Sequence, residues 1–94
     1  MTVVWSPRAI RHLSALRAYI ARDKPEAAAG VALTLLAAVE QLVELPNLGR
    51  PGRLAGTREL VVTGTPYVIP YRVGPERLEI IAVFHGRQQW PARL

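Results

Sequence analysis

The sequence predicts a two-layer α+β domain: a strand, a helical hairpin, and then a three-stranded antiparallel meander. Apolar residues recur at helical spacing in two successive segments between residues 6 and 45. Three β-rich segments separated by short Gly- and Pro-containing turns fill the second half. A chain of 94 residues provides for one domain only, so the hairpin and the meander must share a core.

The chain opens with a predicted strand that leads into a predicted helix. Thr2–Trp5 is a short run of β-branched and aromatic residues, which favours a strand. Ser6-Pro7 then supplies an N-cap and a proline at the first helical position, so we expect a helix that continues to about Arg22. The apolar face of this helix consists of Ala9, Leu13, Leu16 and Ile20. A second, more polar face of this helix consists of Arg8, His12, Ala15 and Tyr19.

Residues 26–45 predict a second helix whose apolar surface is wider than a monomer needs. Asp23-Lys24-Pro25 separates it from the first helix, and Pro46-Asn47-Leu48-Gly49 ends it. A surface helix of a monomer shows one apolar stripe. Here two rows are apolar, namely Val31, Leu35, Leu42 and Leu45, and beside them Ala28, Ala32, Leu36, Val39 and Val43. We therefore expect this helix either to be covered on two sides within the fold or to meet another chain.

The second half predicts a loop over residues 50–56 followed by three strands. The β-rich segments are residues 57–63, 67–73 and 78–85, and the turns between them are short enough for antiparallel hairpins. Pro70 lacks an N–H, which predicts either an edge position or a bulge in the middle segment. We expect the helices to cover one face of the sheet and to leave the opposite face to solvent or to a partner.

Composition excludes several kinds of site. Without cysteine there is no disulfide, thiolate metal site or thiol nucleophile, and this usage fits a reducing cytoplasm. His12 and His85 offer no multi-ligand spacing, so we expect no metal and no other cofactor. The longest uncharged apolar stretch, residues 27–39, is shorter than the ~20 residues of a membrane span, and no signal peptide precedes it. We therefore expect a cytoplasmic protein without a membrane partner.

The charge pattern favours an anionic partner. The formal net charge is +5, and all the basic residues except Lys24 are arginine. Guanidinium groups bind phosphate and carboxylate bidentately, although a high-GC genome would also explain this bias. Basic residues are in excess over residues 1–24 and 50–94, whereas residues 25–49 contain three glutamates and no basic residue.

The candidate site is a basic set on the predicted strands and their exits. It comprises Arg58, Arg72, His85 and Arg87, with Trp90 nearby and Arg50 and Arg53 in the loop. Phosphodiester cleavage requires a proton-transfer group and cations for the developing phosphorane charge, and His85 with Arg72 and Arg87 has that chemistry. The alternative roles are structural: His85 bonded to a backbone carbonyl, Arg72 paired with Glu59 or Glu79, and Trp90 as a lid over the core.

Three segments of the second half are similar to those of a known family. They are Arg58-Glu59-Leu60-Val61-Val62, Gly64-Thr65-Pro66-Tyr67-Val68-Ile69-Pro70-Tyr71-Arg72-Val73 and Phe84-His85-Gly86-Arg87-Gln88-Gln89-Trp90-Pro91. Together with the predicted layout, they resemble the RelE/ParE superfamily of bacterial toxins over nearly the whole chain. The resemblance implies one toxin domain, residues 1–94, of a type II toxin–antitoxin system, neutralised by a cognate antitoxin. We expect the antitoxin to bind the second helix at Leu35, Leu36, Val39, Leu42 and Val43.

The superfamily divides by target, and this sequence resembles ParE more than RelE. RelE-like members cut mRNA in the ribosome, whereas ParE-like members poison DNA gyrase. RelE-like nucleases carry an arginine where this chain has Val68, lysines in the preceding strand, and a tyrosine or other proton-transfer group near the C-terminus. Here Lys24 is the only lysine, and no tyrosine follows Tyr71. We therefore expect a growth-arresting gyrase poison that contacts its target through Arg58, Arg72, His85, Arg87 and Trp90.

Two other hypotheses stay open. In a RelE-like ribonuclease acting on the ribosome and mRNA, Arg87 falls where a nuclease arginine would lie and His85 stands in for the missing acid. Arg72 would be the third catalytic residue. A nucleic-acid-binding module without toxicity would also suit a net charge of +5.

Overall fold

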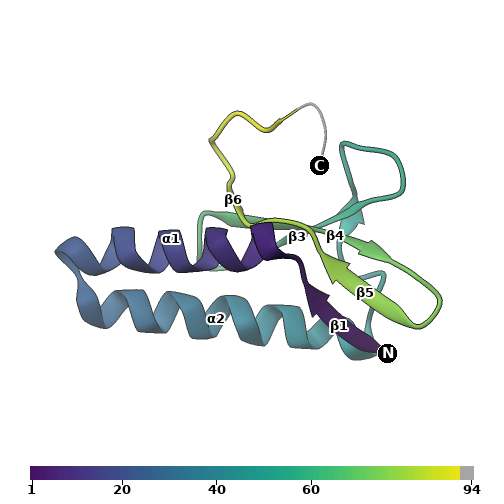
Figure 1. Ribbon diagram of the computed structural model, residues 1–94, viewed down its shortest axis with the longest axis horizontal. Coiled ribbons are helices and arrows are strands. Elements are labelled where there is room, and N and C mark those ends of the chain that lie inside the picture. Colours follow the sequence, from purple (N-terminus) through teal and green to yellow (C-terminus); the bar gives the residue numbers. More distant parts are fainter. Residues whose placement is uncertain (92–94) are drawn as a thin grey trace.

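The computed structural model describes residues 1–91, and in it two antiparallel helices pack beside a mixed β-sheet (Figure 1). The elements in chain order are β1 (Thr2–Trp5), α1 (Pro7–Asp23), α2 (Pro25–Glu44), β2 (Arg50–Pro51), β3 (Arg58–Val61), β4 (Tyr67–Val73), β5 (Arg77–Ile80) and β6 (Phe84–His85). The predicted α+β layout, with a helical hairpin ahead of a meander, is confirmed. The hairpin extends past the end of the sheet and makes the molecule 40 Å long and 23 Å thick.

Ser6 begins α1, as the sequence predicts. Its Oγ accepts a hydrogen bond from the Ala9 N–H (3.0 Å) and donates one to the Ile81 carbonyl (2.8 Å). A single hydroxyl therefore caps the helix and ties it to the segment that follows β5. The predicted apolar face of α1 is also confirmed, because Ala9 and Leu16 are buried while Leu13 and Ile20 pack against the same core.

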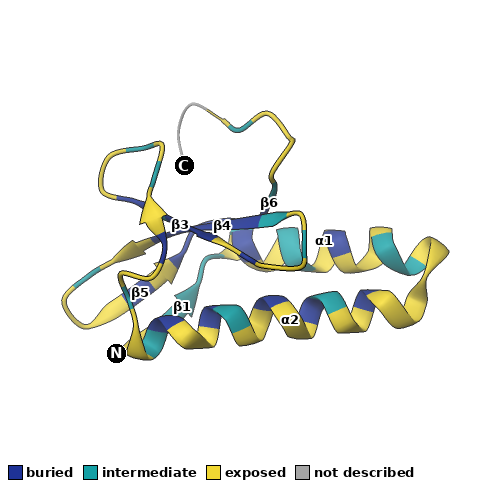
Figure 2. Cartoon of the chain, turned by 180° about the vertical axis from the view of Figure 1, so that it is seen from behind, coloured by how far each residue is buried: buried dark blue, intermediate teal, exposed yellow. Residues whose placement is uncertain are grey.

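α2 buries one stripe, which draws on both of its predicted apolar rows. The buried residues are Ala28, Ala32, Leu35, Val39 and Leu42. Leu33 is 67% exposed and Leu36 43%, so much of the apolar surface stays outside (Figure 2). By length and composition alone α2 could cross a membrane, contrary to the sequence-based expectation. Its buried stripe packs instead into the core of the domain.

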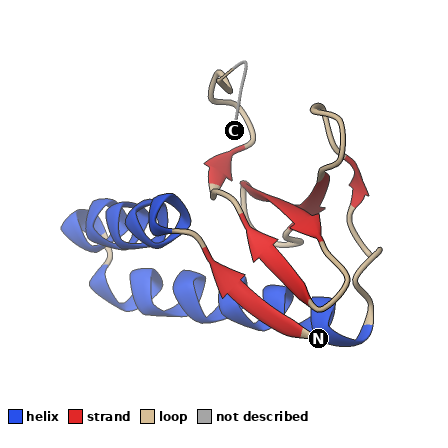
Figure 3. Ribbon diagram, turned by 45° about the vertical axis from the view of Figure 1, so that its right-hand side comes forward, coloured by secondary structure: helices blue, strands red, loops and turns tan. Residues whose placement is uncertain are grey.

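The sheet has the strand order β1-β5-β4-β3-β2 (Figure 3). β3, β4 and β5 form the antiparallel meander that the sequence predicts. β1 lies at one edge, parallel to β5, with Thr2 opposite Arg77 and Trp5 opposite Ile80. The sheet is therefore mixed, and the strand that comes first in the chain pairs with one of the last.

The third β-rich segment is broken into two strands, where the sequence predicted one. β5 pairs with the end of β4, and β6 pairs with its beginning, Tyr67 opposite His85 and Val68 opposite Phe84. Pro70 lies in β4 at the level of this break, and its carbonyl accepts the Ile81 N–H (3.0 Å). In a strand, the N–H and the carbonyl of one residue point to the same side. The N–H that proline lacks would therefore face residues 81–83, where the pairing between the strands is interrupted and requires no hydrogen bond. Of the two predictions for Pro70, the edge position is wrong, because β4 lies between β3 and β5 in the sheet. The predicted bulge fits the register, since residues 81–83 face only residues 69 and 70 between the paired positions.

The loop and the outer face of the sheet also differ from expectation. Residues 50–51 form the short strand β2, which pairs with Arg58 and Glu59 of β3. The face predicted to be open is covered in part by the chain after β5. Its buried residues Ile81, Ala82 and Phe84 form a second apolar cluster with Trp90.

Tyr71 joins the sheet to the end of α2. It is fully buried in β4, and its hydroxyl donates to the Pro46 carbonyl (2.7 Å) and accepts the Gly49 N–H (2.8 Å). A Cβ on Gly49 would lie 2.6 Å from Cε1 of Tyr71, so only glycine allows this approach. The turn after α2 is thereby held against the middle of the sheet.

We expect Tyr71→Phe to lower the free energy of unfolding by about 1–3 kcal/mol, because the buried Gly49 N–H and Pro46 carbonyl would lose their partner. Tyr67→Phe is the matched control, since the Tyr67 hydroxyl makes no hydrogen bond within residues 1–91. Urea unfolding of both variants measures the difference. Equal stability of the two variants would show that the Tyr71 hydroxyl does not stabilise the fold.

Candidate functional site

The structure does not gather the basic residues that the sequence grouped into one site. Arg72 pairs with Glu79 near the end of β4, whereas His85 pairs with Tyr67 at its beginning. Positions 67 and 72 are five residues apart, which is about 17 Å along a strand, and they point to opposite faces. Of the predicted catalytic set, only His85 and Arg87 lie together.

Arg72 and Arg58 make contacts of a structural kind. The Arg72 guanidinium lies 3.6 Å from the Glu79 carboxylate, and both side chains are about half exposed. Arg58 donates to the carbonyl of Gly49 (2.8 Å) and at longer range to that of Asn47 (3.4 Å). Arg58 therefore supports the same turn that Tyr71 holds, and Arg72 forms one of the two ion pairs predicted as its alternative role.

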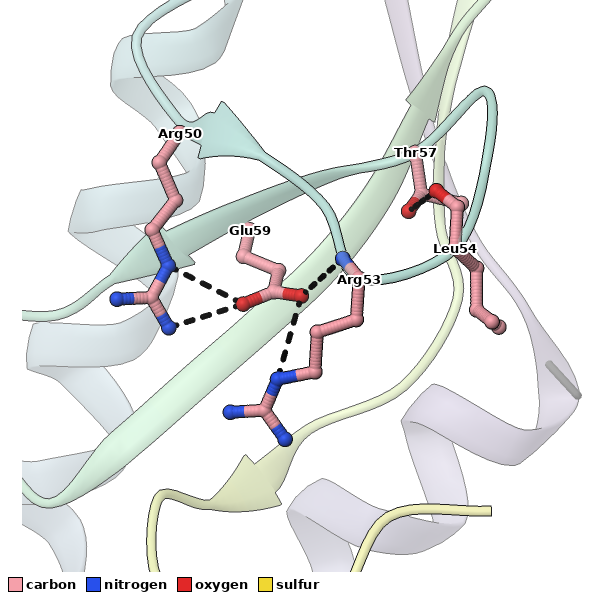
Figure 4. A network of polar contacts seen from close by, with 5 residues as sticks. All are labelled: Arg50, Arg53, Leu54, Thr57 and Glu59. Carbon is pink, nitrogen blue, oxygen red and sulfur yellow. Dashed lines mark hydrogen bonds and ion pairs between the residues drawn. The ribbon is translucent and has the colours of Figure 1, made fainter. Parts of the chain in front are cut away.

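Glu59 binds the two loop arginines (Figure 4). Its carboxylate is 2% exposed and accepts from Nε and Nη2 of Arg50 at 3.1 and 2.9 Å. The other oxygen accepts the Arg53 backbone N–H at 2.8 Å and lies 3.7 Å from Arg53 Nε. A buried carboxylate requires such partners, so the loop charges are largely used to compensate Glu59.

Trp90 packs against the outer face of the sheet. Its ring lies 4.7 Å from that of Phe84, and the Arg53 guanidinium stacks 3.8 Å from its centre. The Trp90 Nε1–H is buried without a partner within residues 1–91. Trp90 therefore covers apolar surface, which matches its predicted role as a lid.

His85 is the last residue of β6 and begins a tight turn. Its Nδ1 accepts the Arg87 N–H (3.1 Å), and its own N–H donates to the Gln88 side chain (2.8 Å). The ring is thus bonded to the backbone through an N–H rather than a carbonyl. It also meets the Tyr67 ring edge-on, with 5.8 Å between the ring centres.

A groove of about 690 Å³ brings His85 together with residues of α1. We call it the α1 groove and define it by His12, Tyr19, Arg22, Tyr67, His85 and Gln88. The sequence pattern placed His12 and Tyr19 on the more polar face of the first helix. It gave no sign that this face lies opposite Tyr67, because the pairing is set by the tertiary fold.

His12 shows the electrostatic character of this region. Its Nδ1 accepts the Val83 N–H (3.1 Å), so the proton of the neutral ring is on Nε2. Burial lowers the pKa of His12 below its ordinary value of 6.5, and the nearby charges of Arg8 and Arg11 lower it further. The imidazole is therefore held neutral beside a positively charged helix surface.

The residues expected to bind an antitoxin are mostly inside the fold. Leu35, Val39 and Leu42 are 0–2% exposed, so the expectation is wrong for these three in the isolated chain. They fill the core between the helices and the sheet. Leu36 keeps exposed surface and Val43 is half-buried, and both remain a prediction for antitoxin contact.

A second groove, of about 630 Å³, lies between α2 and the edge of β3. We call it the α2–β3 groove and define it by Thr34, Ala37, Gln41, Leu48 and Val61. β2 pairs only with Arg58 and Glu59, so the outer edge of β3 continues past the end of β2 at Val61. Val61 is 50% exposed there. Residues 1–91 contain no group of three or more histidine or acidic side chains arranged to hold a metal ion.

Comparison with known proteins gives one consistent family. Residues 3–90 match the family described as ParE toxin of type II toxin–antitoxin system, parDE. A relative from Sinorhizobium fredii that carries the name toxin Y4kP is 49% identical over 93% of this chain and 90% of its own length. Toxin RelE2 of Caulobacter vibrioides is 43% identical over 89% of this chain and 93% of its own length.

Two solved structures share the fold. The chromosomal ParDE toxin–antitoxin system of P. aeruginosa contains a chain that matches with a TM-score of 0.83 and 25% identity, covering 90% of this chain and 95% of that one. A chain of the RelBE2 toxin–antitoxin complex of Mycobacterium tuberculosis matches with a TM-score of 0.62 and 29% identity, covering 89% and 95%.

We expect Glu59→Gln to lower the free energy of unfolding by about 1.5–3 kcal/mol, because Arg50 and Arg53 would lose their charged acceptor. Glu79→Gln is the matched control: it removes the same charge from an ion pair that is half exposed, and should cost less than about 1 kcal/mol. Urea denaturation of the two variants compares these costs. Equal losses would contradict a special role for the Glu59 network.

Proposed function

Since the chain belongs to the family of ParE toxins of type II toxin–antitoxin systems, we propose that it poisons DNA gyrase in the manner of ParE, rather than cutting mRNA in the manner of RelE. Membership makes this chain the toxin of such a pair. The target is the part that we propose. One relative carries the name toxin RelE2, and the two solved structures belong to a ParDE and a RelBE2 system, so the names alone do not choose between the two targets.

The distance between His85 and Arg72 is the observation that carries the proposal. Cleavage of a phosphodiester requires a proton-transfer group and cations around one phosphate. In this chain the two side chains stand at opposite ends and on opposite faces of β4, and Arg72 is paired with Glu79. No movement of a single side chain brings them to one phosphate, since about 17 Å of strand separates them.

The surroundings of Val68 add to this argument. RelE-like nucleases have an arginine at this position, and here Val68 is 6% exposed and pairs with the buried Phe84. Phe84 in turn packs against Trp90. Apolar packing thus occupies the region where the nuclease chemistry would require a charge, which favours a toxin that acts by binding.

The cognate antitoxin is the partner that the family implies, and we propose that part of it docks in the α2–β3 groove. Glu59 directs its backbone polar groups to β2, and Val61, two residues later, directs its own the same way but beyond the end of β2. An exposed strand edge of this kind is a template for another strand. An extended antitoxin segment can pair with it and place apolar side chains between Ala37 and Leu48.

With purified toxin, gyrase and supercoiled plasmid, we expect cleaved plasmid to accumulate, because a poison stalls the enzyme with its DNA cut. The same toxin preparation should leave mRNA intact in a ribosome-dependent primer-extension assay. Unaffected supercoiling together with cut transcripts would reverse the proposal in favour of the ribonuclease.

Val61→Lys should prevent neutralisation and weaken antitoxin binding by about tenfold or more, because a charged side chain on an edge strand blocks pairing. Leu33→Lys is the matched control, since Leu33 is 67% exposed on α2 and does not line the groove. Binding of each folded variant to the antitoxin is measured by calorimetry, and rescue of growth by co-expression. If the antitoxin neutralises Val61→Lys as well as the wild type, it does not dock at this edge.

A further inference from the structure

The α1 groove combines aromatic rings with one arginine side chain, Arg22, in a way that the gyrase proposal does not use. Tyr19 and Arg22 line it from α1, Tyr67 from β4, His85 from β6, and Gln88 from the turn that follows β6. Figure 1 shows α1 running alongside this end of the sheet, below β6. The lining residues include no aspartate or glutamate.

The rings of the groove are available for stacking. Tyr19 is 69% exposed, which is unusual for an aromatic side chain that serves only packing. Tyr67 is half-buried across the groove; burial raises its pKa above 10.0, and the neighbouring Tyr19 raises it further. Its hydroxyl is therefore a neutral donor at physiological pH, and its ring centre lies 5.8 Å from that of His85.

The arginines of α1 form no ion pair with any residue of the described range, 1–91. Within residues 1–91 the ion pairs all involve Arg50, Arg53 or Arg72, which lie outside α1. Arg22 lines the α1 groove, and Arg8 and Arg11 line a hollow at the start of the same helix together with the Arg72–Glu79 ion pair. From Arg8 to Arg22 the helix extends about 21 Å. A polyanion lying along it would meet positive charge at both ends and rings between them.

We propose that the α1 groove binds single-stranded nucleic acid, with a base stacked on Tyr19 and phosphates held by Arg22 and by the arginines at the start of α1. Rings that stack bases, placed among guanidinium groups that bind phosphate, are the combination that single-strand binding uses. An acidic peptide would satisfy the arginines, but its acidic side chains carry no ring to stack on Tyr19. The inference does not depend on whether gyrase or the ribosome is the target, because both hold nucleic acid.

Binding of fluorescent 12-residue oligothymidylate and oligouridylate to the purified toxin tests this site, and comparison of the two separates DNA from RNA. We expect micromolar binding of one or both, on the order of single-strand affinities for a small basic domain, with steep salt dependence. Tyr19→Ala should weaken it about tenfold or more through loss of stacking. Arg22→Gln should lower the slope of log K against log salt by about one.

Arg17→Gln is the matched control, because it removes the same charge from the same helix. Arg17 faces a different hollow, between α1 and α2. Full binding by Arg17→Gln, with loss in Tyr19→Ala and Arg22→Gln, supports the site. Equal weakening by Arg17→Gln and Arg22→Gln would show that only net charge attracts the strand, and would overturn it. Polyglutamate of equal length that competes as well as the oligonucleotide would overturn it too, and so would the absence of binding. None of these outcomes depends on the gyrase assay.

Discussion

The hydrogen bonds of the Tyr71 hydroxyl are the constraint that positions the chain between α2 and the sheet, and the arrangement of the following loop depends on it. By holding the Pro46 carbonyl and the Gly49 N–H, they fix the chain at the point where it leaves α2 and turns back to the sheet. Arg50 follows at once, and its position on β2 brings its guanidinium to the buried Glu59. The Arg53 backbone N–H and side chain complete the contacts of that carboxylate, and the Arg53 guanidinium also stacks on Trp90. A single buried phenol is thereby connected to the loop, the sheet edge and the covering of the outer face.

Eight of the eleven arginines of this toxin fall into two groups with different roles. Arg50, Arg53, Arg58 and Arg72 compensate a buried carboxylate, bind turn carbonyls or pair across strands. The arginines of α1 make no ion pair within residues 1–91, and two of them lower the pKa of His12. Arg77 of β5 and Arg87 after β6 are exposed and also make no ion pair within residues 1–91, so the first helix carries the largest group of such arginines but not all of them. The sequence does not distinguish the two groups, because both consist of arginine.

The helical hairpin presents opposite chemistry on its two members. α2 is acidic and apolar on its outer side, and beside it the edge of β3 is open at Val61. α1 is basic and carries the aromatic groove on the side of β6. A toxin must bind an antitoxin and must also bind its target. The α2–β3 groove and the α1 groove lie on separate sides of this small domain and offer one surface for each. The core is small, and α2 contributes only one stripe of buried side chains to it. Apolar surface therefore remains exposed, and a partner can cover it.

The local sequence determined the elements of this protein, and the tertiary structure decided which of them meet. Ser6-Pro7, the apolar spacing of the helices and the Gly- and Pro-containing turns act within a few residues, so the strand, the hairpin and the meander could be predicted. The parallel pairing of β1 with β5, and the break after Ile80 that re-aims Phe84 and His85, depend on residues far apart in the chain. Dependence on distant residues also explains why the predicted site of Arg72, His85 and Arg87 is not assembled in the fold. Arg72 and His85 are close in type and in sequence, but strand alternation and the break at Pro70 separate them. His12 and Tyr67 are 55 positions apart, and only the folded chain places them in one groove.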